Sequence, residues 1–343
     1  MTAEKWSDDP KTDAGPIISS RVRLARNLRK YRFAPRLSPE AARAMIRDVA
    51  GAVRDAALPG GARLRMIDPR DLTESVRAAL LEGHAVSPEF LSGGAYSPKA
   101  LLLSDDESVG IMINEEDHIR MQAVTPGDDV DGAYAIADGV DDVIERGVEY
   151  AFEPDFGYLT ACPTNAGTGM RASFMAHLPG LALTGQAANV LQSAAKFGIT
   201  ARGIYGEGTK PVGHIFQISN QVTTGKSEGA IIALLRNVTA EVTGREKAAR
   251  KALFSGTNLA DRIWRSYGIL AYARRLGAEE AMEHLSDIRL GFEEGILNIA
   301  RPKRPIYNLM INAQPGRVRA RASGETTDAE TDVSRAECLR SML

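Results

Sequence analysis

The feature that most constrains the fold is a change of pattern near residue 227. Before it, short segments that alternate polar and apolar residues, as strands do, are interleaved with segments of helical period. After it, apolar residues follow helical spacing only, from "EGAIIALLRNVTAEV" through "DRIWRSYGILAYARRL" to "EEAMEHLSDIRLGFEEGIL". Within this part, polar residues 315–332 predict a loop, and a short helix over about 333–342 closes the chain. Strands and helices followed by helices alone predict an α+β core with a helical C-terminal domain.

Several elements of the first part can be placed from their pattern. Residues 17–24, "IISSRVRL", alternate as a strand, with arginines on one face and apolar residues on the other. Residues 38–57 predict a helix that begins with Ser38 as its N-cap and Pro39 in its first turn. The other expected elements are a strand, a polar kink and a second strand over 109–123, helices over 137–150 and 182–197, and strands in "FGYLTACPTN", "TARGIYGEG" and "HIFQISNQVT".

Composition restricts the class of protein. Of the 343 residues, 44% are hydrophobic and 25% are charged, which is ordinary for a globular protein of two domains, or of one large domain with an appendage. A net charge of −2 gives no overall field that would attract nucleic acid or an anionic membrane. The first residues, "MTAEKWSDDPKTDAG", are unlike a signal peptide, and no run approaches the roughly 18 apolar residues of a membrane span. The two cysteines lie too far apart for a disulfide framework. We therefore expect a cytoplasmic protein without nucleic acid or membrane partners.

The stretch "CPTNAGTGMRAS", residues 162–173, contains the spacing G-x-G-x-x-A that cradles a dinucleotide pyrophosphate at a helix start. That fold also needs an acidic residue about 20 positions further on. No Asp or Glu occurs between Asp155 and Glu207, and the gap contains Arg171 and Arg202 instead. The stretch therefore favours phosphate binding by arginines over a dinucleotide fold.

Two further clusters could carry chemistry. Arg21 and Arg23 share one face of the expected strand, where two guanidinium groups repel each other unless an anion lies between them. A solvated edge strand is the alternative. Residues 114–118, "NEEDH", place three carboxylates between two apolar strand segments. This pattern fits a surface turn, a metal site or a site that grips a cation, although the spacing of Asp117 and His118 matches no recognised metal motif.

Cys162 has two interpretations, a buried small hydrophobe or a reactive thiol. The segment "TTGKS" at 223–227 resembles the end of a Walker A loop. That loop needs a glycine at position 220, where this chain has Asn220. A Walker-type nucleotide site is therefore excluded.

Taken together, four blocks occur in the order found in a known superfamily. "SSRVRLARNL", "NEEDHIR", "CPTNAGTGMRAS" and "RGIYGEG" resemble the blocks of the ATP:guanidino phosphotransferases, the phosphagen kinase superfamily, from about residue 17 to about 230. Farther on, "FQISNQVTTGKSE", "RSYGILAYARRL" and "HLSDIRLGFEEGIL" resemble the McsB-type protein-arginine kinases of bacteria. Superfamily members that act on small molecules carry a helical N-terminal domain of roughly a hundred residues, for which the first block at Ser19 leaves no room.

The resemblance implies a fold and an activity. It implies a phosphagen-kinase-like catalytic domain over 17–245, with a largely antiparallel sheet flanked by helices, after a polar segment over 1–16. Residues 246–343 would form a helical domain for dimerisation or regulation, with the polar loop at about 315–332. The implied activity is transfer of the ATP γ-phosphate to arginine side chains of proteins, with Mg²⁺ held mainly by the phosphates and water. A kinase for free guanidino compounds and a non-catalytic adaptor that binds phosphoarginine proteins are the alternatives.

The resemblance also implies roles for individual residues. Glu116 and Glu207 would orient the substrate guanidinium and take its proton, because an arginine pKa above about 12 makes the neutral nucleophile scarce. Cys162, as a thiolate, would add negative charge beside that guanidinium. His84 would pack on adenine, with a surface histidine on a helix as the alternative. The implied nucleotide-binding residues are Ser20, Arg21, Val22, Arg23, His84, Arg120, Arg171, Ala172, Ser173, Arg202, Gly203 and Gly206.

Near the C-terminus the resemblance is imperfect. The family's R-D-x-x-R-A motif, which binds phosphoarginine, corresponds here to Thr331, Asp332, Arg335 and Ala336, so that a threonine replaces the first arginine. Because a guanidinium fork suits phosphate, its loss predicts a weakened regulatory site.

The resemblance finally implies partners. These are protein substrates that bear arginine, a Clp-type protease system in quality control and the stress response, a heat-shock repressor, an activator protein, and a second copy of the chain in a homodimer. Apolar helix faces around Ile263, Trp264, Tyr267 and Leu270 fit a dimer interface and an internal core equally well.

Overall fold

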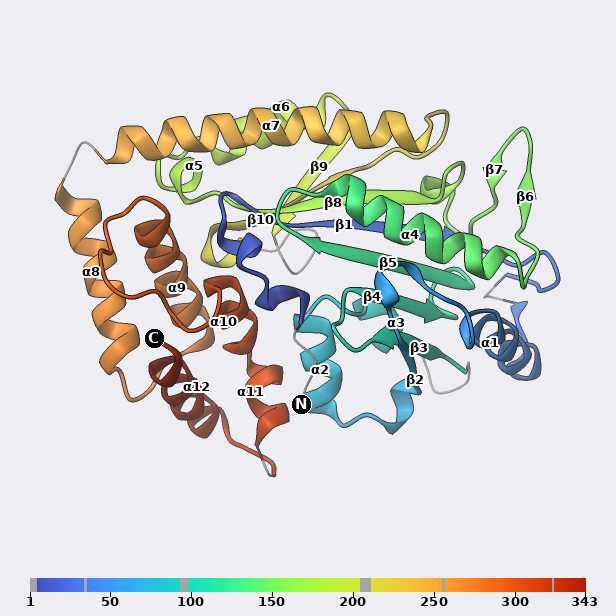
Figure 1. Ribbon diagram of the computed structural model, residues 1–343, viewed down its shortest axis with the longest axis horizontal. Coiled ribbons are helices and arrows are strands. Elements are labelled where there is room, and N and C mark those ends of the chain that lie inside the picture. The colour runs from blue at the N-terminus through green and yellow to red at the C-terminus, as the bar shows by residue number, and fades with distance from the viewer. Residues whose placement is uncertain (1–4, 34–35, 93–97, 204–210, 255–256, 323) are drawn as a thin grey trace.

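The computed structural model describes residues 5–33, 36–92, 98–203, 211–254, 257–322 and 324–343 (Figure 1). At the centre of this part of the chain lies an eight-stranded sheet in the order β2-β3-β4-β5-β1-β8-β10-β9, and its neighbouring strands pair antiparallel. The expected α+β class with an antiparallel sheet is confirmed. The strands are β1 Ile17–Arg26, β2 Leu64–Ile67, β3 Ala100–Ser104, β4 Val109–Ile113, β5 Ile119–Pro126, β8 Met170–His177, β9 Ile199–Gly203 and β10 Ile215–Asn220, with β6 Phe152–Glu153 and β7 Gly157–Tyr158 in a separate hairpin.

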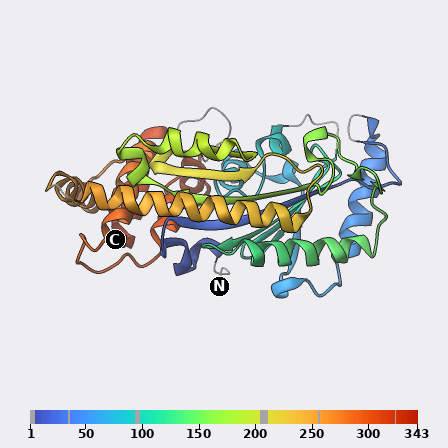
Figure 2. The same ribbon diagram turned by 90° about the horizontal axis from the view of Figure 1, so that it is seen from above.

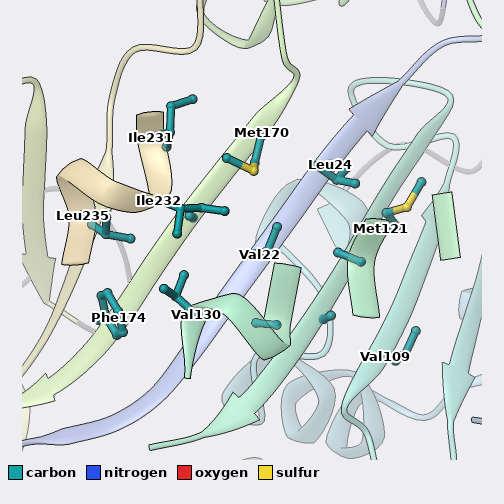
Figure 3. Packing of buried hydrophobic residues seen from close by; sticks show 14 of the residues in the cluster. Val22, Leu24, Val109, Met121, Val130, Met170, Phe174, Ile231, Ile232 and Leu235 are labelled. Atoms are coloured by element: carbon teal, nitrogen blue, oxygen red, sulfur yellow. The ribbon is translucent and has the colours of Figure 1, made fainter. Parts of the chain in front are cut away.

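One face of the sheet is covered by helices (Figures 1 and 2). They are α1 Pro39–Val53, α4 Val130–Glu145, α6 Ala187–Ala195 and α7 Glu228–Leu253, with the short α5 Pro179–Leu183 beside α7. Helix α4 lies over β1 and β5, and α7 lies over β8 and β10. Val22 and Leu24 point from β1 into this layer, and Ile232 of α7 packs there with Phe174 of β8 (Figure 3). Each such buried side chain contributes about 1.5–3 kcal/mol.

The opposite face carries helices at its two ends and polar residues between them. Helices α2 Glu74–Glu82 and α3 Pro88–Ser92 pack through Leu80 and Phe90 on β3 and β4. At the other end, Met175 and Ile215 of the sheet share a core with the C-terminal helices. These helices are α8 Thr257–Tyr272, α9 Ala278–Glu293, α10 Ile306–Asn312, α11 Pro315–Arg321 and α12 Asp328–Met342.

The first described residues contact both the sheet and the C-terminal helices. Trp6 and Thr12 are buried, and the Trp6 ring lies 5.8 Å from the Tyr307 ring of α10. Helix α7 continues across residue 245, so the expected boundaries at 16 and 245 fall within packed structure and stay predictions. Among the described residues, no helix combines the length and the apolar character needed to cross a membrane.

Some element predictions were wrong at their boundaries. The helix expected over 137–150 begins at Val130, because Asp129 caps it by accepting a hydrogen bond from Gly132 N at 3.0 Å. The helix expected over 182–197 is interrupted near Gly185, whose φ of 70° does not fit a right-handed helix.

The polar loop expected over 315–332 is also wrong in large part, since it contains α11 and the start of α12. Helix α11 is held by a residue of another helix, because the Glu82 carboxylate of α2 accepts hydrogen bonds from the main-chain N–H groups of Gly316 and Arg317 at 2.8 and 2.9 Å. Helix α12 begins with a capping box between Thr327 and Glu330, a local signal that the sequence does contain.

Candidate active site

Five arginines lie on one face of the sheet, on four different strands. Arg21 and Arg23 come from β1, and Arg120, Arg171 and Arg202 come from β5, β8 and β9. The strand register places Arg23 directly opposite Arg171. Side chains alternate along a strand, so that Val22 and Leu24 of β1 point into the core and Arg21 and Arg23 point to the other face. The structure therefore brings together all five arginines that the sequence singled out.

The arginines line a cavity of about 690 Å³. The end of α2 and strand β10 also contribute residues to the wall of this cavity. Besides the five arginines, the lining residues are Leu81, His84, Val86, Ser87, Pro88, Glu89, Met112, Glu116, Gln122 and Gln217.

The electrostatics of this cavity favour an anion. Burial, together with the charges of the neighbouring arginines, lowers the pKa of Arg21 to about 10, and the same causes hold the pKa of Arg23 well below its usual value. Among the described residues, Nε and Nη2 of Arg23, Nε of Arg202 and Nε2 of Gln217 are buried and make no hydrogen bond. Buried donors without partners are costly. A polyanion would satisfy these donors and separate the like charges.

Arg120 is held by an acid of the NEEDH cluster to which the sequence assigned no separate role. Glu115 accepts a hydrogen bond from Arg120 Nη1 at 2.5 Å and another from Ser87 Oγ. Burial alone raises the pKa of Glu115, but the Arg120 charge and the hydrogen bonds from Arg120, Ser87 and the Glu116 N–H together outweigh burial and hold the pKa below its usual value. The sequence contains one signal for this ion pair, because Glu115 and Arg120 flank the same short turn.

Glu116, the next residue, is exposed and reaches the cavity from the turn between β4 and β5. The partial removal of its carboxylate from water at the cavity wall, followed by the charges of Asp117 and Glu115, raises the pKa of Glu116. A second cavity of about 150 Å³ adjoins the first, with Glu116 and Cys162 in its wall. Because Arg23, Arg120 and Arg171 line both cavities, Glu116 stands where the two meet.

Cys162 lies on a short turn with a hydroxyl neighbour. Its Sγ lies 2.9 Å from Thr164 Oγ1, and its side chain forms a hydrogen bond that opposes the upward pKa shift of Glu116. The thiol is partly exposed, so it is not the buried hydrophobe of the first interpretation. Its position beside the acid agrees with the role implied by resemblance, which stays a prediction.

The glycines of the opening motif shape this turn. Gly167 and Gly169 have φ values of 97° and 61°. A Cβ on Gly169 would meet the Ala25 carbonyl oxygen at 2.6 Å, so β1 can approach only a glycine there. The segment that resembled a Walker loop supports the same turn, because Thr223 Oγ1 donates to the carbonyl of Ala166 at 2.6 Å. These glycines therefore serve chain packing.

Asp117 and His118 fix the loops behind the site. Asp117 accepts hydrogen bonds from Asn27 Nδ2 at 2.6 Å and from Ala161 N at 2.7 Å. His118 Nδ1 accepts from Leu28 N at 3.0 Å. Within the described ranges, no group of three His, Cys, Asp or Glu residues is arranged to hold a metal ion. Asp117 thus ties the acidic turn to the cysteine turn, and His118 ties it to the segment that follows β1.

Several predicted nucleotide-binding residues do not reach the cavity with their side chains. Val22 and Ala172 are fully buried in the core on the other face. Ser20 Oγ accepts from Asp129 N and donates to the Gly127 carbonyl, each at 2.8 Å, and so anchors the start of α4. The reason is the alternation of a strand, which turns every second residue of a contiguous motif away.

The other nucleotide-binding predictions fall into three groups. Ser173 lines a small cavity that also contains Arg21 and His84. Gly203 is the last residue of β9. Gly206 and the predicted second acid, Glu207, lie outside the described residues.

Comparison with known proteins places the chain in a family. The sequence profile of the ATP:guanido phosphotransferase C-terminal catalytic domain matches residues 45–249, and that of the protein-arginine kinase McsB C-terminal domain matches residues 256–343. A protein-arginine kinase of Moorella thermoacetica is 42% identical over 342 residues, covering 99% of this chain and 97% of the relative. One of Halalkalibacterium halodurans is 41% identical, covering 98% and 94%. The chain belongs to the protein-arginine kinase family.

Solved structures agree on the fold. A lombricine kinase has a TM-score of 0.60 at 21% identity, over 73% of this chain and 70% of that one. The duplicated taurocyamine kinase from Schistosoma mansoni has a TM-score of 0.62 at 21% identity, over 81% of this chain and 41% of that one. The expected phosphagen-kinase-like fold is thereby confirmed.

His84, the residue expected beside adenine, lies just after the end of α2 in a left-handed conformation with φ of 58°. Burial, followed by the charges of Arg21, Arg317 and Arg23, lowers the pKa of His84 to about 3. The imidazole is therefore neutral at physiological pH and forms part of the cavity wall.

The residues that correspond to the family's phosphoarginine motif are engaged within the fold. Arg335 is 1% exposed, and its guanidinium donates to the carbonyls of Ala313 at 2.5 Å and Leu276 at 2.6 Å and to Asp332 at 2.6 Å. Thr331 and Ala336 are buried. Arg335 thus holds three segments together, and the weakening of the regulatory phosphoarginine site stays a prediction.

Proposed function

We propose that this protein transfers the γ-phosphoryl group of ATP to arginine side chains of other proteins. The observation that carries the proposal is the position of Glu116 between the five-arginine cavity and the smaller cavity beside Cys162. A polyanion in the first and a guanidinium in the second would meet at this residue. Membership in the protein-arginine kinase family supports the same activity.

The larger cavity suits the triphosphate of ATP. The unpaired donors of Arg23, Arg202 and Gln217 can bind phosphate oxygens, and planar guanidinium groups present paired N–H groups to such oxygens. The neutral His84 ring offers a surface for adenine. Mg²⁺, bound mainly through the phosphates and water, would neutralise charge as the phosphoryl group leaves.

The smaller cavity suits the substrate guanidinium. In the reaction a guanidinium nitrogen forms a bond to the γ-phosphorus, the bond to the β,γ-bridging oxygen breaks, and ADP leaves with that electron pair. The nitrogen loses one proton, for which we propose Glu116 as the acceptor. A carboxylate with a raised pKa accepts a proton more readily than an ordinary one. Glu207 would be the second carboxylate, and Cys162 would add negative charge beside the nitrogens.

A protein-bound arginine fits the surroundings of Cys162. Ala161, Pro163 and Thr164 are exposed, and Cys162 is partly exposed, so the smaller cavity can be approached from the surface. A guanidinium on a long side chain can enter such a site while its own protein stays outside. Free guanidino compounds and an adaptor role are the alternatives.

The test uses the purified chain, ATP and an unfolded protein rich in arginine, with mass spectrometry under non-acidic conditions. We expect acid-labile phosphate on arginine, and a loss of rate of about 10²–10⁴-fold in Glu116→Gln, because a positioned general base contributes that much. Faster transfer to free arginine than to protein would favour the small-molecule alternative. Binding of phosphoarginine proteins without consumption of ATP would favour the adaptor.

We further infer, from the family resemblance, a role in quality control and the stress response in the cytoplasm, with a Clp-type protease, a heat-shock repressor, an activator and a homodimer. Ile263 and Leu270 of α8 are fully buried in the C-terminal core, whereas Trp264 and Tyr272 are 41% and 77% exposed. The exposed pair provides an apolar surface for a second copy. Sedimentation of Trp264→Ser/Tyr272→Ser should show monomers where the parent chain shows dimers.

A further inference from the structure

The wall of the arginine cavity that carries His84 is held by a helix from the far end of the chain. Helix α11 packs against α2, and a Cβ on Gly316 would meet Ala78 Cβ at 2.6 Å. As noted above, Glu82 at the end of α2 accepts hydrogen bonds from the first N–H groups of α11. The two helices therefore pack in close contact at Gly316. Glu82 and Gly316, which join them, are more than 230 positions apart in the sequence.

Arg317 of α11 makes the contact that reaches the cavity wall. Its guanidinium lies directly on Gly83, where an added Cβ would stand 2.1 Å from Nη2. The same guanidinium donates to Glu107 Oε2 at 2.8 Å, and Glu107 is also paired with Lys5 at 3.1 Å. The Arg317 side chain is thus clamped between a buried acid and the residue that precedes His84.

His84 depends on this support because its main chain is in an unfavourable conformation. A φ of 58° is costly for a residue with a Cβ and persists only when the surroundings hold it. Its N–H donates to the Leu81 carbonyl at 3.0 Å, and its own carbonyl accepts from Gln122 Nε2 at 2.8 Å. Gln122 anchors the turn from the sheet, and Arg317 covers it from the opposite side.

We propose that α11 is a structural part of the nucleotide site, in which Arg317 is a positioning residue that holds the Gly83–His84 turn in the shape that receives adenine. This inference rests on the proposed function for the identity of the nucleotide. It assigns the adenine side of the cavity to the C-terminal helices and the phosphate side to the sheet. Removal of Arg317 then weakens base recognition and leaves the five arginines in place.

The test measures binding of ATP and of inorganic tripolyphosphate to Arg317→Ala by calorimetry, alongside steady-state kinetics. We expect Kd and KM for ATP to rise roughly tenfold, since small misplacements of binding groups have effects of this size or larger. Binding of tripolyphosphate and kcat at saturating ATP should be unchanged. Arg321→Ala, on the same helix but paired with Asn312, is the matched control and should behave as the parent chain.

Gly83→Ala tests the same contact from the other side, and remains informative if Arg317→Ala fails to fold. Its Cβ would displace the Arg317 guanidinium, so it should reproduce the loss of ATP affinity. The double variant should bind ATP no more weakly than either single variant, because both substitutions remove the same contact between Arg317 and Gly83. Equal weakening of ATP and tripolyphosphate, or a fall in kcat with KM unchanged, would overturn the inference. A lack of arginine phosphorylation in the parent chain would overturn the proposed function alone.

Discussion

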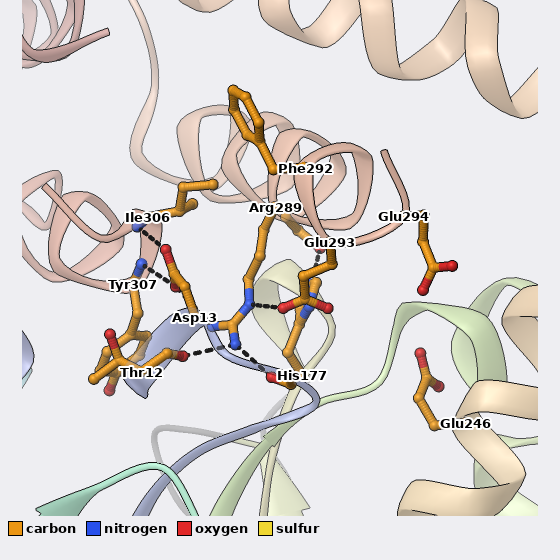
Figure 4. A network of polar contacts seen from close by, with 12 residues as sticks. Thr12, Asp13, His177, Glu246, Arg289, Phe292, Glu293, Glu294, Ile306 and Tyr307 are labelled. Atoms are coloured by element: carbon orange, nitrogen blue, oxygen red, sulfur yellow. Dashed lines mark hydrogen bonds and ion pairs between the residues drawn. The ribbon is translucent and has the colours of Figure 1, made fainter. Parts of the chain in front are cut away.

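Two groups of arginines in this protein have opposite surroundings. The five arginines of the cavity face one another, and several of their donors make no hydrogen bond in the described structure. Arg250 of α7 and Arg289 of α9 are more deeply buried and lie among acids. Figure 4 shows Arg289 beside Asp13 and Glu293. Arg250 pairs with Glu246 at 2.6 Å and with Glu293, and Arg289 donates to Glu293 at 2.9 Å and to the Thr12 carbonyl at 2.7 Å.

The pKa values express this difference. Burial and like charges lower the pKa of Arg21 to about 10. Burial alone would also lower the pKa of Arg250, but Glu293 and Glu246 outweigh burial and raise it. The second group is paired with acids of the chain and joins α7, α9 and the N-terminal segment, whereas Arg23 and Arg202 of the first group keep buried donors that an added anion would satisfy. The same side chain therefore serves binding in one place and structure in the other.

The largest expected effect is a loss of activity when a cavity arginine is removed. Arg23→Met should lower kcat/KM for ATP by about 10³-fold or more, the range found when an arginine that stabilises a phosphoryl transition state is removed. The free energy of unfolding should not fall, because the change removes a cation crowded by like charges. Kinetics and urea unfolding measure the two effects. Arg65→Met, on exposed β2 of the same sheet, is the control. A marked loss of stability with normal activity would contradict the assignment.

The structural group should respond in the opposite way. Arg250→Met should lower the free energy of unfolding by about 3–5 kcal/mol, because it leaves the buried carboxylate of Glu246 without its ion-pair partner and that of Glu293 with Arg289 alone. The fraction that remains folded should keep its activity. Urea unfolding provides the measurement. Replacing both acids by glutamine in the same variant should restore much of the stability, and no restoration would mean that the loss has another cause.

The smallest expected effect is a difference in pH dependence. Burial raises the pKa of Glu293, but Arg289 and Arg250 outweigh burial and hold it below its usual value. Because the folded pKa lies below the unfolded one, this contribution is present above the unfolded pKa of about 4.3 and is lost as pH falls through the folded pKa. The stability difference between the parent chain and Glu293→Gln should therefore be constant near neutral pH and shrink below about pH 4. A difference that stays the same down to pH 3 would contradict the pairing.

The residues of the candidate site were easier to predict from the sequence than the contacts that surround them. Arg21 and Arg23 could be assigned to one face because a strand has a period of two, and the blocks containing Arg120, Arg171, Cys162 and Glu116 were recognisable by resemblance. The same local period explains why a contiguous motif does not place all of its side chains in the cavity, since those of Ser20, Val22 and Ala172 face away from it. Glu115 was noted only as a member of the NEEDH cluster, and its pairing with Arg120 was not predicted, because the turn between β4 and β5 brings the two side chains together.

Local periodicity and short motifs were enough to predict the α+β class, the superfamily and the five arginines that line the larger cavity. Which arginines are paired depends on the three-dimensional fold, because Arg250 and Arg289 lie among acids whereas Arg23 and Arg202 keep buried donors without a hydrogen-bond partner among the described residues. The fold also forms a helix from the polar residues 315–321 beside the turn that carries His84. Charge pairing and helix docking depend on groups that approach each other through space, such as Glu82 with Gly316 or Arg289 with Thr12. No local pattern records such contacts, because each partner alone resembles an ordinary polar surface residue.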